Sequence, residues 1–583
     1  MFIFPQPKKI ICTGELKNPA LQFNVLRNDF GVDIEYALTK LKLCDNGMPI
    51  SIIKCTDYKK EQYTLILDNS GVCITASSQR GAFDALATLR QMIRQPDLRC
   101  TIIEDEPDFE NRGFLFSIGR LLKMSEFKKF IDFLADLKFN QLQFTAERTA
   151  FETMELHDDS GQILSLDDMQ ELNEYCKMNM IELIPEVNSF GHMHDWLALD
   201  KYKDIAVCPQ GFYRTDEYNR TSLCKPGTLD PNNPQALELV DRIYSWLLQA
   251  FTSTNLNVGC DETFDLGEGK CKELAKTIGK NKIYTDYMNK LAGICKKHNK
   301  KMMFWADMIV DDYEALKRMP NDSTALIWGY EEDHPFEEQC RNVKESGLDF
   351  YVCPGTSAWG SIVGRSTNMQ RNQFSAAKNG KDFGAEGYLL TDWGDCGYIH
   401  TRTVTYLPIV YGAGISWGVD NNSDIHNAFD YLDMHLFREK GFSEFLYNCG
   451  EAYQLEAYKR FNHAVVVTPL YTNLDDNVYM YDQKIENFEK IVKFANDRLV
   501  ELDNYKRCPT EYVEEIKLNL KMLIVLSKVC IVKLKGNISK DEIITELENV
   551  INEHKRIWLR NNTNHGIDTF INSANKIIKA LKD

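Results

Sequence analysis

The stretch "LNVGCDETFDLGEG", residues 256–269, joins an apolar run to two adjacent carboxylates and a loop rich in glycine. The run from Leu256 to Cys260 has the character of a short buried strand, and Asp261 and Glu262 follow it directly. Neighbouring side chains inside a strand point to opposite faces, so the two acids share a site only where the strand ends and the chain turns. The stretch therefore predicts a strand that delivers two carboxylates at its end.

Seven other apolar runs resemble this one, and most are followed by an amphipathic pattern of helical length. The eight expected strands are "GFLFS" (113–117), "NQLQFTA" (140–146), "IELIPEV" (181–187), "LNVGC" (256–260), "KMMFWAD" (301–307), "TALIWG" (324–329), "DFYVC" (349–353) and "EGYLLTD" (386–392). Buried strands that alternate with helices favour a parallel sheet. Eight of them predict an α/β fold of the TIM (β/α)8 barrel type, whose catalytic groups follow the C-terminal ends of the strands.

Different patterns flank the barrel on both sides. Short alternating runs such as "YTLILD" (63–68) precede a helical pattern at 79–95, which predicts a small α/β domain over residues 1–105. The barrel is expected over residues 106–430. Long helical patterns without strand signals then predict a C-terminal helical domain over residues 431–583.

Composition limits the classes of partner. The 583 residues carry a formal net charge of -17, which disfavours nucleic acid because phosphate binding needs a clustered basic face. The most apolar late stretch, residues 522–535, is interrupted by Lys528 and Lys533 and is too short to span a bilayer, so no membrane partner is expected. The seventeen cysteines form no CxxC pair, and the N-terminal residues do not have the pattern of a secretory signal, so we expect a cytoplasmic protein with reduced thiols.

Tryptophans and aspartates gather just past the ends of the expected strands. Four of the eight tryptophans lie there, together with three aspartates: Trp305, Trp328, Trp359, Trp393, Asp307, Asp392 and Asp395. Aromatic rings pack on the C–H faces of a sugar, and carboxylates accept hydrogen bonds from its hydroxyls. The pattern predicts a sugar-binding cup at this face of the barrel.

The motif "VGCDETFDLGEG" (258–269) resembles the Asp-Glu motif of family 20 glycoside hydrolases, the β-N-acetylhexosaminidases. "NRGFLFSIGR" (111–120), "PEVNSFGHM" (185–193) and "TDWGD" (391–395) are similar to the family's first, third and eighth strands. The resemblance covers about residues 105 to 430, and the N-terminal α/β unit matches the small domain that usually precedes the family's barrel. It implies an exo-acting enzyme that releases terminal GlcNAc, GalNAc or both from glycans without a cofactor or a metal.

The resemblance also implies how hydrolysis proceeds. The 2-acetamido oxygen of the substrate attacks its own anomeric carbon, so the configuration is retained through an oxazoline intermediate and no enzyme nucleophile is needed. Glu262 would protonate the leaving oxygen and later activate water, which requires a raised pKa. Asp261 would orient the acetamide and stabilise the positive charge on the intermediate.

Further roles are carried over from the resemblance residue by residue. Arg112 would bind ring hydroxyls, and Asp395 would accept from distal hydroxyls. Trp305, Trp328 and Trp393 would wall the acetamide pocket, and His192 and Glu147 would lie beside Glu262. The family's acetamide-binding tyrosine is replaced near the seventh strand by Trp359, whose indole N–H is a substitute donor. Together with Asn188 in place of an aspartate and "FTAERTAFE" (144–152) at the second strand, this departure indicates a divergent subgroup.

Two other functions stay open on the sequence alone. "HMH", His192 to His194, is typical of metal-dependent amidohydrolase barrels, in which His334, His400 and Asp392 would complete a metal site. A non-catalytic sugar-binding barrel is the second alternative, because a fold does not fix a function. The presence of both Asp261 and Glu262 favours the hydrolase.

Overall fold

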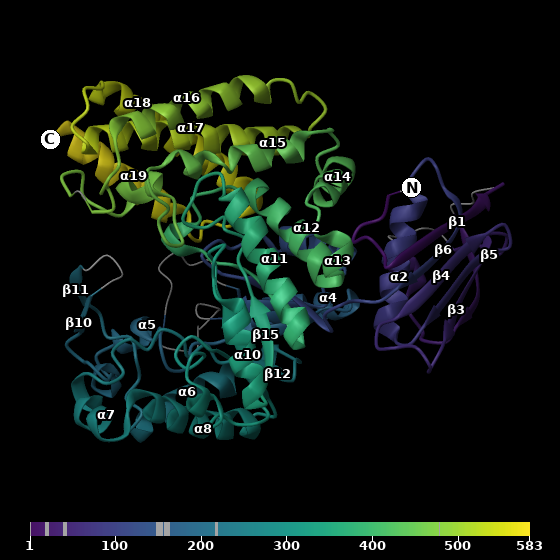
Figure 1. Ribbon diagram of the computed structural model, residues 1–583, viewed down its shortest axis with the longest axis horizontal. Helices are drawn as coiled ribbons and strands as arrows, with labels where there is room; N and C mark the ends of the chain where they lie inside the picture. The colour runs from purple at the N-terminus through teal and green to yellow at the C-terminus, as the bar shows by residue number, and fades with distance from the viewer. Residues whose placement is uncertain are drawn as a thin grey trace.

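The computed structural model of the protein describes residues 2–17, 22–38, 43–146, 156, 164–215, 220–476 and 478–583. Figure 1 shows a six-stranded sheet near the N-terminus at the right, a central barrel, and the C-terminal helices at the upper left. This arrangement confirms the predicted fold class, a TIM barrel between a small α/β domain and a helical region. The domain boundaries at residues 105 and 430 stay predictions.

The N-terminal sheet has the strand order β1-β6-β4-β5-β3-β2. Its strands are β1 (Lys9–Glu15), β2 (Phe23–Asn28), β3 (Met48–Lys54), β4 (Tyr63–Asp68), β5 (Gly71–Ala76) and β6 (Arg99–Asp105). In β4 the buried residues alternate with half-buried ones, as a strand with one covered face requires. The cover is α2 (Gln79–Ile93), which begins where the Ser78 side chain accepts a hydrogen bond from the Gly81 amide. A short helix, α1 (Ile34–Ala37), completes the domain.

The barrel closes through eight parallel strands in the order β12-β13-β14-β15-β16-β7-β8-β9. They are β7 (Asn111–Phe116), β8 (Gln141–Thr145), β9 (Glu182–Glu186), β12 (Asn255–Asn257), β13 (Lys301–Trp305), β14 (Thr324–Trp328), β15 (Asp349–Cys353) and β16 (Gly387–Asp392). All eight strands expected from the sequence are present. Large apolar side chains, among them Leu115, Ile184, Met303 and Leu389, fill the interior as a packed core.

Helices cover the outside of the barrel. The long ones are α3 (Met124–Asp136), α4 (Leu166–Met178), α6 (Pro234–Leu247), α8 (Lys280–Lys297), α10 (Phe336–Ser346), α11 (Ser366–Phe383) and α12 (Thr403–Trp417), and the short ones are α5 (His194–Leu197), α7 (Lys272–Ile278) and α9 (Tyr313–Leu316). Local sequence fixes their ends. Ser165 and Asp168 form a capping box at the start of α4, and Gly347 ends α10 in the left-handed conformation.

The C-terminal region consists of α13 (Val419–Asn422), α14 (His426–His435), α15 (Phe442–Cys449), α16 (Ile485–Leu502), α17 (Thr510–Lys533), α18 (Lys540–Asn561) and α19 (Ile567–Lys582). The apolar helix α17 packs between α16 and α18. Its Glu515 and Asn519 side chains accept hydrogen bonds from Thr403 and Thr401, which attaches the helices to the barrel. Among the described helices, none combines the length and the apolar character that crossing a membrane requires.

Candidate active site

The C-terminal ends of the barrel strands surround a cavity of about 410 Å³, which we call the strand-end pocket. Residues at or just past the C-terminal ends of seven of the barrel strands line it, as expected of a barrel active site. Its lining residues are Ser117, Ile118, Gly119, Thr145, Glu186, Asn188, His192, Asp261, Glu262, Trp305, Trp328, Tyr330, Trp393, Gly394, Asp395, Asn462 and His565.

The backbone after β12 explains how Asp261 and Glu262 reach the same pocket. Positive φ angles at Gly259 (66°), Cys260 (73°) and Glu262 (49°) turn the chain, so the alternation of a strand no longer separates the two acids. A side chain at Gly259 would lie 2.5 Å from Asn188 Oδ1, so only glycine fits there. The Glu262 amide donates to Asp307 Oδ2 over 3.0 Å, which holds the turn against β13.

His192 stands between the two acids. Its Nε2 lies 3.3 Å from Asp261 Oδ2 and 3.5 Å from Glu262 Oε2. The residue has a φ of 55°, a strained conformation of the kind that collects at functional sites. The structure thus brings together the three side chains that the sequence analysis grouped, whereas Glu147 lies outside the described residues.

Burial in this part of the barrel raises the pKa of two carboxyls, Glu262 and Asp307. Desolvation in the pocket raises the pKa of Glu262, and the Asp261 charge raises it further, while His192 and Arg214 oppose the rise. Desolvation also raises the pKa of Asp307 well above its usual value, again with Asp261 adding to the effect. A carboxyl with a raised pKa keeps its proton nearer to neutral pH, which is what a general acid needs.

Aromatic rings form the walls beside the acids. Trp305 packs edge-on against Trp393 with ring centroids 5.7 Å apart, and Trp328 stacks on Tyr330 at 5.2 Å. The indole N–H of Trp393 donates to the Tyr330 hydroxyl over 2.7 Å. Within the described residues, the indole nitrogen of Trp305 has no hydrogen-bond partner. The walls therefore offer apolar ring faces and the hydroxyl of Tyr330 to a ligand.

The prediction that Trp359 lines the site is wrong. Its ring is fully buried and packs edge-on against Tyr330, at a centroid distance of 4.9 Å and an angle of 89°. It fills the space beside Gly355, where an added Cβ would come within 2.2 Å of the ring. Tyr330 therefore separates Trp359 from the pocket and presents its own hydroxyl there. The sequence could have indicated Tyr330 as a pocket residue, because it follows the end of β14 by two residues.

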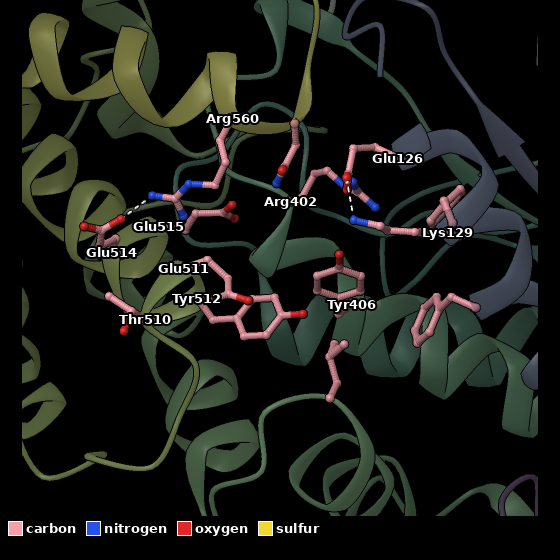
Figure 2. A pocket seen from close by; sticks show the side chains of 14 residues that line it. Glu126, Lys129, Arg402, Tyr406, Thr510, Glu511, Tyr512, Glu514, Glu515 and Arg560 are labelled. Atoms are coloured by element: carbon pink, nitrogen blue, oxygen red, sulfur yellow. Dashed lines mark hydrogen bonds and ion pairs between the residues drawn. The ribbon is translucent and has the colours of Figure 1, made fainter. Parts of the chain in front are cut away.

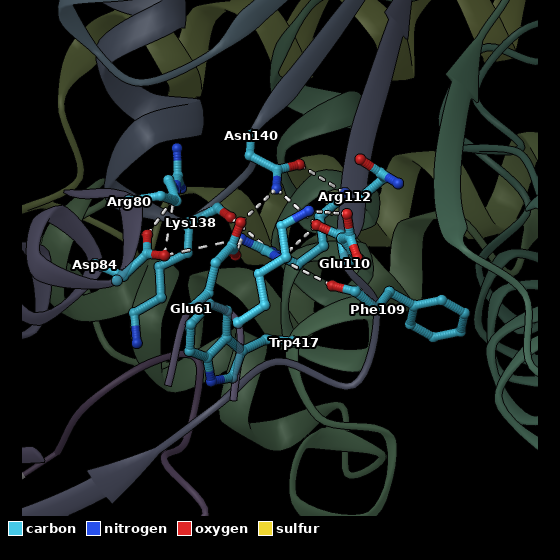
Figure 3. A network of polar contacts seen from close by, with 12 residues as sticks. Glu61, Arg80, Asp84, Phe109, Glu110, Arg112, Lys138, Asn140 and Trp417 are labelled. Carbon is cyan, nitrogen blue, oxygen red and sulfur yellow. Dashed lines mark hydrogen bonds and ion pairs between the residues drawn. The ribbon is translucent and has the colours of Figure 1, made fainter. Parts of the chain in front are cut away.

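The assignment of Arg112 to the sugar is also wrong. Arg112 is the second residue of β7 and lies at the opposite end of the strand from the pocket. Its guanidinium is 1% exposed, donates to Glu61 over 2.8 Å and to the Phe109 carbonyl over 2.8 Å, and lies 3.8 Å from Asp84. Figure 3 shows these contacts. They form the junction between the N-terminal domain and the barrel, so Arg112 has a structural role.

The remaining predicted residues divide into two groups. Asp395 and Asn188 line the strand-end pocket, and desolvation raises the pKa of Asp395. Asp392 is not part of the lining. Its carboxylate accepts a hydrogen bond from Thr356 over 2.6 Å, and burial raises its pKa to about 6. Asp392 therefore supports the loop after β15 from beneath the pocket.

The histidines of the metal-site alternative do not converge. His194 Nδ1 lies 2.7 Å from the Pro226 carbonyl oxygen, and His334 Nε2 lies 2.8 Å from Gln339 Oε1. His400 is buried beside Arg120, whose guanidinium donates to its carbonyl. In the described parts of the chain, no three His, Cys, Asp or Glu side chains are grouped so that they could hold a metal ion.

A second cavity, of about 510 Å³, lies between α3, α12 and the C-terminal helices. Figure 2 shows that its charged groups face one another: Glu126 pairs with Lys129 at 2.8 Å, and Glu514 pairs with Arg560. The Arg402 guanidinium packs over the Tyr406 ring. Because many of its charges are already paired, this cavity offers no group with the character of a catalytic acid, and the strand-end pocket is the candidate active site.

Two family models match the chain. The model for the catalytic domain of glycosyl hydrolase family 20 matches residues 109–385, and the model for domain 2 of the same family matches residues 16–106. Together they cover more than half of the sequence. The first match includes seven of the eight barrel strands, and the second includes most of the N-terminal sheet.

Curated relatives are distant. A β-hexosaminidase 1 of Coccidioides posadasii is 24% identical over 46% of this chain and 49% of its own length. A β-hexosaminidase subunit beta of Felis catus is 24% identical over 65% of this chain and 73% of its own. A lacto-N-biosidase of Bifidobacterium bifidum is 23% identical over 48% of this chain and 25% of its own. The chain spans about half the length of the Coccidioides posadasii relative and of a β-hexosaminidase of Emericella nidulans, to which it is also 24% identical.

Solved structures share the fold. A chitobiase of Flavobacterium johnsoniae superposes with a TM-score of 0.61 at 16% identity, covering 94% of this chain and 95% of its own. A family 20 exo-β-N-acetylglucosaminidase of Vibrio harveyi, in complex with N-acetylglucosamine, has a TM-score of 0.58 at 15% identity and covers 74% and 77%. At these identities the likeness shows the fold alone.

Proposed function

Because the chain belongs to glycosyl hydrolase family 20, we propose that it is an exo-acting β-N-acetylhexosaminidase, which releases terminal GlcNAc, GalNAc or both from glycans. The observation that carries the proposal is the position of Asp261 and Glu262. Both acids face one pocket with aromatic walls, and His192 Nε2 lies within 3.5 Å of each. Two adjacent carboxylates are the set that substrate-assisted hydrolysis uses, because the substrate itself supplies the nucleophile.

Glu262 is the general acid in this scheme. The glycosidic oxygen needs a proton as the bond to the anomeric carbon breaks, and the raised pKa of Glu262 keeps that proton available. The acetamide oxygen forms the new bond to the anomeric carbon, and the leaving group departs as an alcohol. Glu262, now ionised, then takes a proton from the water that opens the oxazoline and is ready for the next cycle.

Asp261 and the aromatic walls position the acetamide. The Asp261 carboxylate accepts the acetamide N–H and stabilises the positive charge that spreads over the N–C–O group of the intermediate. Trp305, Trp328 and Trp393 enclose its methyl group. Tyr330 is placed to donate to the acetamide oxygen, since its hydroxyl accepts from Trp393 and so keeps its own proton for another acceptor.

We also propose that the protein works in a reducing compartment such as the cytoplasm. All sixteen cysteines with described side chains are free thiols, and eleven of them are buried, where they pack as small apolar groups. A glycan or glycoconjugate with a terminal N-acetylhexosamine is the partner that the pocket fits, and the acidic net charge argues against nucleic acid.

Turnover of chromogenic β-N-acetylglucosaminide and β-N-acetylgalactosaminide, measured side by side, tests the proposal. We expect hydrolysis of at least one of them, with the same rate before and after treatment with a chelator. The competing function, a sugar-binding barrel without catalysis, predicts tight binding of a thiazoline analogue with no release of the chromophore. Loss of activity on chelation and its return with a divalent ion would instead support a metal-dependent hydrolase.

A further inference from the structure

Two residues of the strand-end pocket come from outside the barrel. Asn462 lies in the segment between two 3-10 turns, Ala452–Leu455 and Val465–Leu470, and His565 lies in the connection between α18 and α19. The C-terminal region therefore reaches back over the strand ends and closes part of the pocket that contains Asp261 and Glu262.

The backbone of Asn462 is clamped in place. Its amide donates to Glu331 Oε1 over 2.7 Å, and both oxygens of Glu331 accept from Arg365, at 3.0 and 2.9 Å. The next residues approach the barrel as well, because the Ala464 amide donates to the Gly360 carbonyl over 2.8 Å. Asn462 has a φ of 62°, which asparagine tolerates better than most residues. The ion pair between Glu331 and the buried Arg365 thus fixes this residue at the edge of the pocket.

The side chain of Asn462 is the part left without a partner. Its Oδ1 is enclosed and accepts no hydrogen bond from any described residue, although the residue lines the pocket. A buried acceptor without a donor is unfavourable, so such groups usually mark the place of a ligand or a water. A side-chain amide can both donate to and accept from a hydroxyl, which is the group that a sugar presents most often.

The described part of the barrel contributes no lining residue to the side of the pocket where Asn462 lies, beyond Tyr330. Between Tyr330 and Trp393, no described barrel residue belongs to the lining, since Trp359 in the loop after β15 is buried behind Tyr330. The Asn462 backbone is hydrogen-bonded to Glu331, the residue next to Tyr330. Asn462 therefore occupies the side of the pocket that the loop after β15 does not supply.

We propose that Asn462 binds a ring hydroxyl or the hydroxymethyl group of the terminal N-acetylhexosamine, so that the C-terminal region takes part in sugar recognition. The proposal rests on the proposed function. In this role Asn462 does not touch the reacting bond. It selects the sugar and holds it against the tryptophans.

Replacing Asn462→Gly tests the proposal, because glycine accepts the positive φ and removes only the side chain. The matched control is Asn299→Gly, at an exposed asparagine with a φ of 57° in the turn before β13, at the opposite end of the barrel. We expect kcat/KM for the parent sugar to fall about tenfold in Asn462→Gly, the loss expected for one hydrogen bond to a ligand, and to stay unchanged in Asn299→Gly.

Deoxy sugars identify the contact. Wild type and Asn462→Gly are compared on aryl glycosides that lack the hydroxyl at carbon 3, 4 or 6. One of these should be hydrolysed about equally well by both proteins, because its missing hydroxyl is the partner of Asn462. If removal of each hydroxyl lowers kcat/KM by the same factor in the wild type and in Asn462→Gly, Asn462 binds no hydroxyl and the proposal is overturned.

Calorimetric binding of the corresponding thiazolines gives the same comparison without catalysis. If the wild type binds thiazolines but hydrolyses no glycoside, the proposed function fails while the deoxy comparison still decides the role of Asn462. Absence of thiazoline binding in the wild type would overturn both. Equal circular dichroism and melting temperature of the two glycine variants ensure that a loss at Asn462 reflects recognition.

Discussion

Nε2 of His192 lies 3.5 Å from Oε2 of Glu262, close enough for a charge on the histidine to change the pKa of the proposed acid. A positive charge on His192 lowers the pKa of Glu262, while desolvation and the Asp261 charge raise it, and the rise dominates. The proton affinity of the acid is thus the difference between opposing effects, and each of them is accessible to mutation.

The change Glu262→Gln should abolish most hydrolysis of substrates with alkyl leaving groups and affect activated aryl glycosides much less. Only a poor leaving group needs a proton at departure, and general acid catalysis typically contributes about 10²–10⁴-fold. Steady-state kinetics on the two substrate types measures the difference. Glu268→Gln, the same change at an exposed glutamate of the same loop, is the control and should behave as the wild type. Equal losses on both substrate types would remove Glu262 from the role of acid.

The pH dependence of kcat/KM should have an alkaline limb above the pH at which an ordinary glutamate titrates. The raised pKa means that Glu262 stays protonated to higher pH, and activity falls as pH rises through that pKa. Since protonated His192 lowers this pKa, His192→Asn should move the limb to still higher pH. Asparagine is chosen because it tolerates the φ of 55°. His194→Asn serves as the control, and a limb that does not move in His192→Asn would show that His192 does not tune the acid.

Removing the Tyr330 hydroxyl with Tyr330→Phe should lower kcat by roughly 100-fold, the usual effect of losing one donor to developing charge. The ring keeps its stacking on Trp328, so the fold should be little changed. Tyr287→Phe removes another buried hydroxyl, which donates to the Ser189 carbonyl, and should affect stability more than kcat. Kinetics and melting temperatures of both variants separate the two effects. An unchanged kcat in Tyr330→Phe would show that Tyr330 is not the donor to the acetamide oxygen.

Arg112→Met should destabilise the protein by about 3–5 kcal/mol, because Glu61 would stay enclosed without the guanidinium from which it accepts. The folded fraction should keep its kcat, since Arg112 lies at the far end of β7 from the pocket. Urea unfolding and kinetics at low temperature measure both quantities. Arg99→Met, at an exposed pair with Asp97, should change stability by less than about 1 kcal/mol. A variant that is stable but binds sugar poorly would restore Arg112 to the site.

The sequence predicted the barrel because buried strands leave continuous apolar runs, and all eight runs correspond to strands. It also placed Asp261 and Glu262 at a strand end, since their position depends only on local order. Tyr330 was missed because the choice between it and Trp359 depends on which ring packs behind the other. Arg112 was wrongly assigned to the pocket because the motif does not show that this residue lies at the N-terminal end of β7, away from the pocket. Asn462 comes from a region more than 60 residues beyond the last strand, and only long-range packing brings it to the pocket.

The central claim is that the substrate's own acetamide is the nucleophile. The most direct measurement compares kcat/KM for aryl glycosides whose N-acetyl group carries zero, one, two or three fluorine atoms. Fluorine withdraws electrons from the acetamide oxygen and scarcely changes its size, so a nucleophilic oxygen attacks more slowly with each substitution. The account predicts a steep and continuous fall in kcat/KM across the series. Equal rates for all four substrates would contradict it, because the acetamide would then take no part in breaking the glycosidic bond.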